Sequence, residues 1–438
     1  MELGMFSWRQ AVVLLWLLPL LHADTEDSPY DPDVNLNTPQ TIRRHGYPAE
    51  AHTVQTADGY ILTMHRIPGG RARGDEEAED EAPGARVGIP PGPTSRPRHR
   101  PVLLHHGLMG SSYAWILAGP GRGLAYLLAD AGYDVWMANA RGNIYSRAHA
   151  SLPTYSSSPF WDFSFHEVGV YDLPAEMEYI LQTTGASQLH YVGHSMGTTA
   201  LFALAAARPR AAARLASAFA LAPVVFVRHV KSPIRLLAPF ARDAEYLAHL
   251  LGKGELLPHS KILKHLAKYG CELLPIDKTL CENMVFIICG YDPAQFDKAL
   301  LPVMLSHSAQ GASTKTAIHY AQMINSGKFQ QFDYGAQENM KRYNSTAPPS
   351  YDLSKINVST HLYYAANDWL ASVMDVNSLY TDLQCKKSKY LVPFPTFNHL
   401  DFILAKDVKK LLYDDIIKQL QQEDNGSDKG YGILYPRF

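Results

Sequence analysis

Short apolar runs alternate with longer amphipathic stretches over two separate parts of the chain. The runs predict strands because they are short, rich in Val, Tyr and Leu, and bounded by turn residues. They lie at residues 60–67, 101–106, 133–138, 188–192, 217–221, 361–366 and 389–394. The intervening stretches 121–131, 168–184, 195–208 and 405–422 predict helices. This alternation predicts an α/β fold with a mostly parallel central sheet and helices on both of its faces.

Residues 224–350 interrupt this alternation. They contain amphipathic helical stretches, such as 233–252 and 261–270, and no clear strand-like run. A helical segment inserted between strands of one sheet is expected to form a cap. The sequence therefore predicts a core in two parts (33–222 and 351–422), a helical cap or lid domain at 223–350 and a flexible tail at 423–438.

One low-complexity insert, residues 69–100, separates two of the predicted strands. It reads GGRARGDEEAEDEAPGARVGIPPGPTSRPRHR and combines an acidic run with Gly, Pro and Arg. Such a segment cannot bury enough apolar surface to offset its chain entropy, so we expect a disordered loop. A role as an acidic docking loop is the weaker alternative because charge runs are usually just solvated.

The N-terminal segment predicts a signal peptide at residues 1–23. Arg9 precedes an unbroken apolar run from Ala11 to Leu21, and small Ala23 comes before acidic, polar sequence. This run is too short to span a bilayer and fits a secretory h-region better than a buried N-terminal helix. We expect cleavage near Ala23, although Leu21 is not ideal at the −3 position. The protein is then secreted or lysosomal, without a stable transmembrane anchor.

Composition narrows the classes of partner and cofactor. The net charge is −2 and the isoelectric point is near 6.8, which gives no support for nucleic-acid binding. The chain has no C-x-x-C, no H-E-x-x-H and no cluster of His with carboxylates, so we expect no metal and no other cofactor.

Three N-x-S/T sequons and four cysteines suit an exported protein. The sequons at Asn344, Asn357 and Asn425 are candidate glycosylation sites. The four cysteines are too few for a disulfide scaffold, but they allow one or two bridges. They are Cys271, Cys281, Cys289 and Cys385.

The stretch LHYVGHSMGTTALFALAAA, residues 189–207, carries a candidate nucleophile, Ser195. A G-x-S-x-G motif alone is common by chance, and a glycine-flanked turn without chemistry is the alternative. Here an apolar strand-like run precedes it and an Ala- and Leu-rich helical run follows. Gly193 and Gly197 remove side chains where the backbone must pass closely, as in a nucleophile elbow.

A nucleophilic serine needs a general base and an acid that orients it, and α/β-hydrolases supply them in the order Ser, Asp or Glu, His. After residue 361 the only histidine is His399, in FPTFNHLDF. Asp368, in HLYYAANDWLA, follows the preceding strand and is the predicted acid. Asp375 and Asp382 lie further into the next helix and are poorer candidates.

Backbone N–H groups must also stabilise the oxyanion of the tetrahedral intermediate. One is expected from Met196, directly after the nucleophile. The other is expected from Leu108, in the loop LLHHGLMGSS after the strand at 101–106.

Nine sequence blocks resemble the acid lipase family, which includes gastric and lysosomal acid lipases. They are HGYPAEAHTVQTADGYILTMHRIP, LLHHGLMGSS, LADAGYDVWMANARGN, FWDFSFHEVGVYDLPA, LHYVGHSMGTT, ALAPV, FIICGYD, SGKFQQFDYG and FNHLDFI. The resemblance runs from about residue 33 to about residue 420, except for the insert. It implies an α/β-hydrolase fold with a helical cap and lid that cleaves carboxylic esters of lipids, such as triacylglycerols or cholesteryl esters.

The resemblance also assigns single residues. Ser195, Asp368 and His399 match the family's triad, and Leu108 and Met196 match its oxyanion donors. Cys271 and Cys281 resemble its cap disulfide, Cys289 its unpaired cysteine and Asn344 a glycan site, whereas Cys385 has no assigned counterpart. The motif GHSMG departs from the vertebrate GHSQG, which removes a polar side chain and makes the pocket more apolar. The insert is longer than the family suggests.

The sequence therefore predicts a monomeric lipase that acts on neutral lipids at an emulsion, lipoprotein or membrane surface. A carboxylesterase acting on smaller esters is the first alternative, because pocket depth separates the two classes. A catalytically inert lipid-binding protein is the second, although such a protein would be expected to lose one of the three triad residues. A peptidase is a weaker reading.

Overall fold

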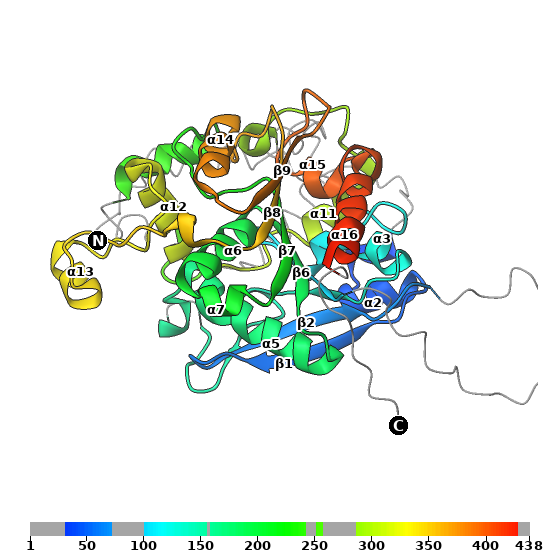
Figure 1. Ribbon diagram of the computed structural model, residues 1–438, viewed down its shortest axis with the longest axis horizontal. Helices are drawn as coiled ribbons and strands as arrows, with labels where there is room; N and C mark the ends of the chain where they lie inside the picture. The colour runs from blue at the N-terminus through cyan, green and yellow to red at the C-terminus, as the bar shows by residue number, and fades with distance from the viewer. Residues whose placement is uncertain (1–30, 72–99, 156–157, 242–250, 257–285, 428–438) are drawn as a thin grey trace, which may run out of the picture.

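A single mixed β-sheet forms the centre of the molecule. The computed structural model describes residues 31–71, 100–155, 158–241, 251–256 and 286–427. Within these ranges a nine-stranded sheet has the order β1-β2-β4-β3-β6-β7-β8-β9, with β5 paired to β2 (Figure 1). The strands are β1 (Glu50–Gln55), β2 (Tyr60–Ile67), β3 (Val102–His105), β4 (Val135–Met137), β5 (Ala148–His149), β6 (Leu189–His194), β7 (Leu215–Leu221), β8 (Ser359–Tyr364) and β9 (Lys386–Leu391).

The sheet is mostly parallel, as the alternation of strands and helices predicts. Strands β4, β3, β6, β7, β8 and β9 run parallel to one another, whereas β2 pairs in antiparallel fashion with β1, β4 and β5. Every residue of β3 and β6 is buried because helices cover both faces of the sheet. The carboxyl ends of these parallel strands therefore meet at one edge, where ligand sites of α/β folds form.

Helices pack on both sides of the parallel strands. Figure 1 shows α3 and α16 on one side of β6–β8 and α5, α6 and α7 on the other. The longer core helices are α2 (Thr38–Arg44), α3 (Leu124–Asp130), α5 (Leu173–Thr184), α6 (Met196–Ala207), α14 (Val373–Asp382) and α16 (Asp414–Ser427). The short ones are α4 (Phe165–Glu167), α7 (Pro209–Ala212) and α15 (Asp401–Leu404), with π-helical turns at Val168–Asp172 and Lys409–Tyr413.

The sequence reasoning missed one strand and misplaced one boundary. Strand β1 (EAHTVQ) was not predicted because it lies at the sheet edge and has no apolar run. The predicted tail boundary at 423 is wrong, since α16 continues to Ser427. Glu423 bonds to His361 and Asp424 to His190, and these contacts hold the last turns of α16 against the sheet.

Between β7 and β8 the chain is helical in the residues that the structure describes. Helices α11 (Leu301–Ser306), α12 (Thr314–Ser326) and α13 (Ala336–Tyr343) follow one another there, and no described residue from 223 to 350 belongs to a named strand. The predicted helix 233–252 begins as a 3₁₀ segment, Pro233–Phe240, with Pro239 inside it. Proline cannot donate the hydrogen bond that an α-helix needs, which explains the difference.

Several predictions fall outside the described residues. They are the signal peptide at 1–23, most of the insert (72–99), the helix at 261–270, the cysteines Cys271 and Cys281, and the tail from 428 onwards.

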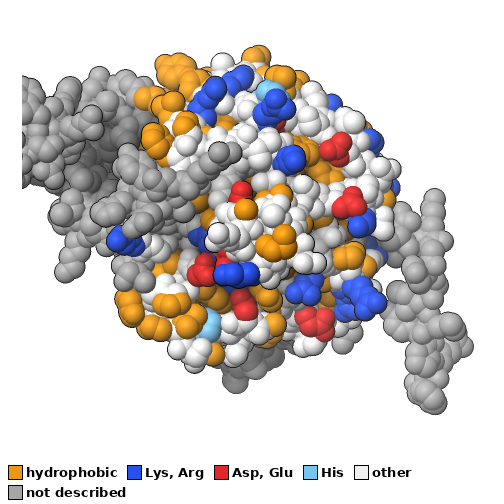
Figure 2. All heavy atoms as spheres, turned by 90° about the vertical axis from the view of Figure 1, so that its left-hand side faces the viewer, with side chains coloured by type: hydrophobic (Ala, Val, Ile, Leu, Met, Phe, Trp, Pro, Cys, Tyr) orange, Lys and Arg blue, Asp and Glu red, His pale blue; other side chains and the backbone are white. Residues whose placement is uncertain are grey.

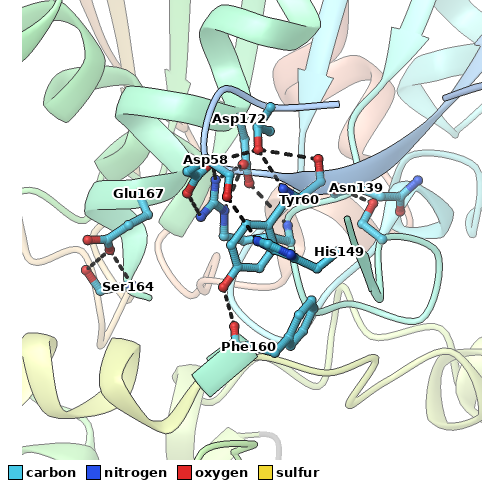
Figure 3. Close-up of polar contacts among 11 residues, drawn as sticks. Asp58, Tyr60, Asn139, His149, Phe160, Ser164, Glu167 and Asp172 are labelled. Carbon is cyan, nitrogen blue, oxygen red and sulfur yellow. Dashed lines mark hydrogen bonds and ion pairs between the residues drawn. The ribbon is translucent and has the colours of Figure 1, made fainter. Parts of the chain in front are cut away.

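A buried ion cluster fastens the loop after β4 to the β1–β2 turn. Arg141, which is 2% exposed, donates to Asp172 at 2.8 Å and to both oxygens of Asp58 at 2.7 and 3.0 Å. Its guanidinium lies 3.8 Å from the ring centre of Tyr60, one of the residues labelled in Figure 3. Burial raises the pKa of Asp172 to about 6, against the effect of Arg141. We interpret this cluster as structural, because it pairs its charges internally.

Candidate active site

Ser195 stands at the sharp junction of β6 and α6. Its backbone angles, φ 53° and ψ −117°, lie in a sparsely populated region for a residue with a side chain. The hydroxyl makes no hydrogen bond to any residue within the described ranges, and Ser195 is partly exposed while both of its neighbours are buried. This is the geometry of a nucleophile elbow, in which strain presents the serine oxygen above the sheet.

The two glycines of the motif are required by close backbone contacts. A Cβ on Gly197 would lie 2.4 Å from the carbonyl oxygen of His105 at the end of β3. A Cβ on Gly193 would lie 2.8 Å from the carbonyl carbon of Gly197. No side chain fits at either position, so α6 can begin directly beneath Ser195 only because both residues are glycine.

Asp368 and His399 form a buried pair on the loops that follow β8 and β9. Nδ1 of His399 lies 2.9 and 3.0 Å from the two carboxylate oxygens of Asp368. Asp368 also accepts hydrogen bonds from the N–H groups of Leu370 and Ala371, both at 2.8 Å. The carboxylate thus fixes the proton of His399 on Nδ1. Nε2 of His399 is buried and has no hydrogen-bond partner among the described residues, so its lone pair is available to accept a proton.

A hydrogen bond joins the loop of His399 to the elbow of Ser195. Nε2 of His194, the residue before Ser195, donates to the carbonyl oxygen of His399 at 3.0 Å, and the two rings lie 4.9 Å apart. Burial, followed by the effect of His399, lowers the pKa of His194 to about 3, which keeps its ring neutral. The structure therefore places the loop of His399 against the residue beside Ser195, although no hydrogen bond joins Ser195 Oγ to His399. Catalytic hydrogen bonds are often long before substrate binds.

The two predicted oxyanion donors lie beside Ser195. A Cβ on Gly107 would be 3.1 Å from Cβ of Ser195, so the turn that carries Leu108 contacts the nucleophile. The backbone N–H groups of Leu108 and Met196 donate to no acceptor among the described residues. Free N–H groups on both sides of a serine form an oxyanion hole when they point at the reacting oxygen.

His106 rigidifies this turn. Its Nδ1 donates to the carbonyl of Gly107 at 2.7 Å, and its Nε2 accepts the N–H of Ala140 at 3.1 Å. Burial lowers the pKa of His106 to about 3, so the ring stays neutral and can serve both bonds.

A segment in the middle of the predicted cap region, around Cys289, supports the loops of Asp368 and His399. The carbonyl of Cys289 accepts hydrogen bonds from the N–H groups of His399 and Trp369, both at 3.3 Å. Gly290 comes within van der Waals distance of Asn367, the residue before Asp368. The sequence reasoning missed the supporting roles of His106, His194 and Cys289. The only local signal was the position of each histidine directly beside a motif residue.

Comparisons with known proteins identify the family of this chain. Residues 38–119 match the family model described as a partial alpha/beta-hydrolase lipase region, and residues 100–274 match the alpha/beta hydrolase fold. The chain is 37% identical to human lysosomal acid lipase/cholesteryl ester hydrolase over 413 residues, which cover 94% of this chain and 97% of that protein. This chain belongs to the acid lipase family.

This acid lipase family member is also similar to a second relative and to a solved structure. Bovine gastric triacylglycerol lipase is 37% identical over 396 residues, which cover 90% of this chain and 93% of that protein. A soluble variant of monoglyceride lipase from Saccharomyces cerevisiae has a TM-score of 0.50 at 15% identity and covers 91% of this chain and 99% of that one. This solved structure shares the fold. The predictions of the family and of the α/β-hydrolase fold are thus confirmed.

The remaining predicted site residues of this acid lipase family member are placed as follows. Asp375 binds His229 at 2.8 Å instead of His399, and Asp382 is exposed. Asn344, Asn357 and Asn425 are all exposed. Cys289 is buried and free, and Cys385 is free and half-buried. No helix in the described part of the chain is both long and apolar enough to cross a membrane.

Gly290→Ala is expected to damage both stability and activity. Gly290 has φ +113°, and an added Cβ would meet the carbonyl oxygen of Asn367 at 2.2 Å. The strain and the clash together should lower the free energy of unfolding by about 3 kcal/mol. They should also lower kcat, because the displaced Asn367 carries Asp368 with it.

Gly185→Ala is the matched control for this substitution. Gly185 has φ +71°, but an added Cβ would meet nothing within 4 Å. It should cost about 1 kcal/mol and leave kcat unchanged. Chemical denaturation and initial rates on a soluble ester measure both quantities. Equal losses in the two variants would contradict the steric argument.

Proposed function

We propose that this protein is a serine lipase that hydrolyses the ester bonds of neutral lipids, with triacylglycerols and cholesteryl esters as substrates. The observation that carries the proposal is the buried Asp368–His399 pair, whose base loop is hydrogen-bonded to the elbow of Ser195. Membership of the acid lipase family supports the substrate class. The human relative is named a cholesteryl ester hydrolase and the bovine one a triacylglycerol lipase.

The proposed reaction is an acyl transfer in two steps. Ser195 Oγ attacks the ester carbonyl carbon while Nε2 of His399 takes the hydroxyl proton. The carbonyl oxygen becomes an oxyanion and receives hydrogen bonds from the N–H groups of Leu108 and Met196. His399 then gives the proton to the leaving alcohol as the C–O bond breaks. A water molecule, deprotonated by His399, then attacks the acyl carbon; the bond to Ser195 Oγ breaks, Oγ takes the proton back from His399, and the fatty acid is released. Asp368 stabilises the imidazolium in both steps.

An exposed apolar rim beside the acid loop supports binding at a lipid surface. Trp369 accepts hydrogen bonds at its carbonyl from Lys231 and Ser232, and its N–H bonds to Cys289, so three chain segments meet there. These segments carry exposed large hydrophobic side chains, namely Leu236, Phe240, Ile287, Ile288, Tyr291 and Met374. Figure 2 shows the side of the molecule on which α12, α13 and α14 lie, where hydrophobic side chains gather in separate clusters between charged ones. Such patches on a protein surface mark interaction sites.

The remaining finer assignments are part of the same proposal. The protein enters the secretory pathway and is secreted or lysosomal, and it carries glycans on Asn344, Asn357 and Asn425, whose exposure supports this. It acts as a monomer with a core at 33–222 and 351–427 and a cap at 223–350. A Cys271–Cys281 disulfide joins two cysteines of that cap.

The test compares an emulsified long-chain triacylglycerol, cholesteryl oleate in lipid droplets and a short soluble ester. We expect release of fatty acid from the two lipid substrates, because binding of the apolar rim to the lipid surface brings their ester groups close to Ser195. Hydrolysis of the short ester alone would instead identify a carboxylesterase. Hydrolysis of none of the three would favour an inert lipid-binding protein, and a droplet co-flotation assay measures that binding.

A pair of rim variants separates lipid docking from chemistry. Replacing Ile287 and Ile288 with serine should lower the rate on the emulsion about tenfold and leave the rate on the soluble ester unchanged. Met340→Ser on α13 is the matched control, because Met340 and Ile288 are both 46% exposed. It should change neither rate. Equal effects of the rim and control variants would contradict docking through the rim.

A further inference from the structure

Two buried carboxyl groups lie beside the loop of His399 and have no role in the proposed reaction. Asp292 is 0% exposed and Asp401, two residues after His399, is 3% exposed. Neither forms a salt bridge with a Lys or Arg in the described part of the chain. Burying two ionised carboxylates without a neighbouring cation is costly in free energy, so we do not expect both groups to be ionised.

Asp401 clamps the residue that precedes His399. Oδ2 of Asp401 accepts the N–H of Asn398 at 2.6 Å, and Oδ1 of Asn398 accepts the N–H of Asp401 at 3.2 Å. The side-chain amide of Asn398 donates to the carbonyl of Gly290 at 3.0 Å. Asn398 is thus held between Asp401 and Gly290, and the direction of His399 depends on this clamp.

Asp292 faces the clamp from the segment after Gly290. Its Oδ1 accepts the N–H groups of Ala294 at 3.1 Å and Gln295 at 3.3 Å. Its Oδ2 is buried and receives no hydrogen bond from a described donor. Asp292 and Asp401 can bond to each other only if one of them carries a proton, because two carboxylates have no donor between them.

The surroundings favour a proton on Asp401. Burial raises the pKa of Asp401 to about 8, the N–H of Asn398 lowers it, and the charge and proximity of Asp292 raise it further. The other titratable groups nearby are Asp368, the thiol of Cys289, and the rings of His399 and His194. Burial, then Asp368 and Asp401, raise the pKa of Cys289, so the thiol stays neutral.

We propose that Asp401 carries a proton and donates it in a hydrogen bond to Asp292, and that this bonded pair positions His399 against Asp368. The proton gives the hydrogen bond between the two carboxyl groups, which closes the Asn398 clamp. Loss of the proton at alkaline pH leaves two carboxylates that repel each other, and the clamp opens. This positioning role rests on the proposed function, because it acts through His399.

Asp401→Asn tests the pair because an amide reproduces its protonated form. The new Oδ1 can accept the N–H of Asn398, and the new Nδ2 can donate to Asp292 at any pH. We expect kcat of the parent on a soluble ester to fall about tenfold per pH unit above about pH 8, with KM unchanged. The variant should keep its kcat through this range. Asp292→Asn should also keep its kcat, because the new Nδ2 can donate a hydrogen bond to Asp401. It is the variant to test if Asp401→Asn does not fold.

The control is Asp414→Asn, which removes a half-exposed carboxylate paired with Lys409. It should reproduce the parent's pH profile. An alkaline fall in kcat that persists unchanged in the folded Asp401→Asn or Asp292→Asn variant would overturn the proposal.

A second readout does not depend on ester cleavage. The low-field proton resonance of the Asp368–His399 hydrogen bond should disappear from the parent above about pH 8 and persist in Asp401→Asn. If the parent cleaves no ester, the proposed function fails, while this resonance still decides whether the pair positions His399. The same loss of the resonance in parent and variant would overturn the proposal, and its retention in the variant alone would support it.

Discussion

Ser195→Ala is expected to lower kcat for ester hydrolysis by about 10⁴- to 10⁶-fold, because no other group can form the acyl-enzyme. The fold should be unaffected. Ser195 Oγ makes no hydrogen bond to a described residue, and alanine differs from serine by this one atom. The positive φ of 53° is equally unfavourable for both residues. Initial rates on a soluble ester and a thermal unfolding curve for each protein measure the two effects.

Ser388→Ala is the matched control for this experiment. Ser388 also belongs to a serine–histidine–carboxylate array, because its hydroxyl lies 2.8 Å from Nδ1 of His361, whose Nε2 is 3.2 Å from Glu423. That array has no elbow, and it lies at the start of β8 and β9, away from the carboxyl ends of the strands. Its loss should leave kcat unchanged. A fluorophosphonate should label the parent on Ser195, and labelling on Ser388 or activity in Ser195→Ala would contradict the assignment.

The places of Ser195, Asp368 and His399 in the fold could be predicted from the sequence because they depend on strand ends and chain order. Ser195, Asp368 and His399 each follow an apolar run that forms a parallel strand, β6, β8 or β9. The carboxyl ends of parallel strands meet at one edge of the sheet, so recognising the strands is sufficient to bring the three residues together. The local sequence pattern and the sheet topology both place these three residues at the carboxyl edge of the sheet.

The supports of the site could not be predicted, because they depend on contacts between distant segments. Nothing in the periodicity of residues 286–292 indicates that the carbonyl of Cys289 meets the N–H groups of Trp369 and His399. The pairing of Asp292 with Asp401 joins segments more than a hundred residues apart. Short-range patterns also missed β1, whose exposed side chains reflect its place at the sheet edge.

Asp368→Asn is expected to lower kcat by about 10⁴-fold with a small effect on stability. The asparagine oxygen can still accept the N–H groups of Leu370 and Ala371, which Asp368 Oδ1 accepts at 2.8 Å. Its Nδ2, however, presents protons to Nδ1 of His399. This nitrogen must then accept a hydrogen bond, which moves the ring proton to Nε2 and removes the lone pair that takes the proton of Ser195. Steady-state rates and the rate of fluorophosphonate labelling should fall together.

Asp375→Asn is the matched control, because it changes a second aspartate–histidine pair a few residues away, in which the aspartate is buried and His229 is partly exposed. Asp375 is 2% exposed, and its carboxylate lies 2.8 Å from Nδ1 of His229. Breaking this pair should cost stability, since Asp375 also accepts the N–H of His229 and the hydroxyl of Ser372. It should leave kcat of the folded protein nearly unchanged, because His229 contacts neither Ser195 nor His399. If both variants lost activity equally, a buried aspartate–histidine pair would be needed only for folding, and the orienting role of Asp368 would be refuted.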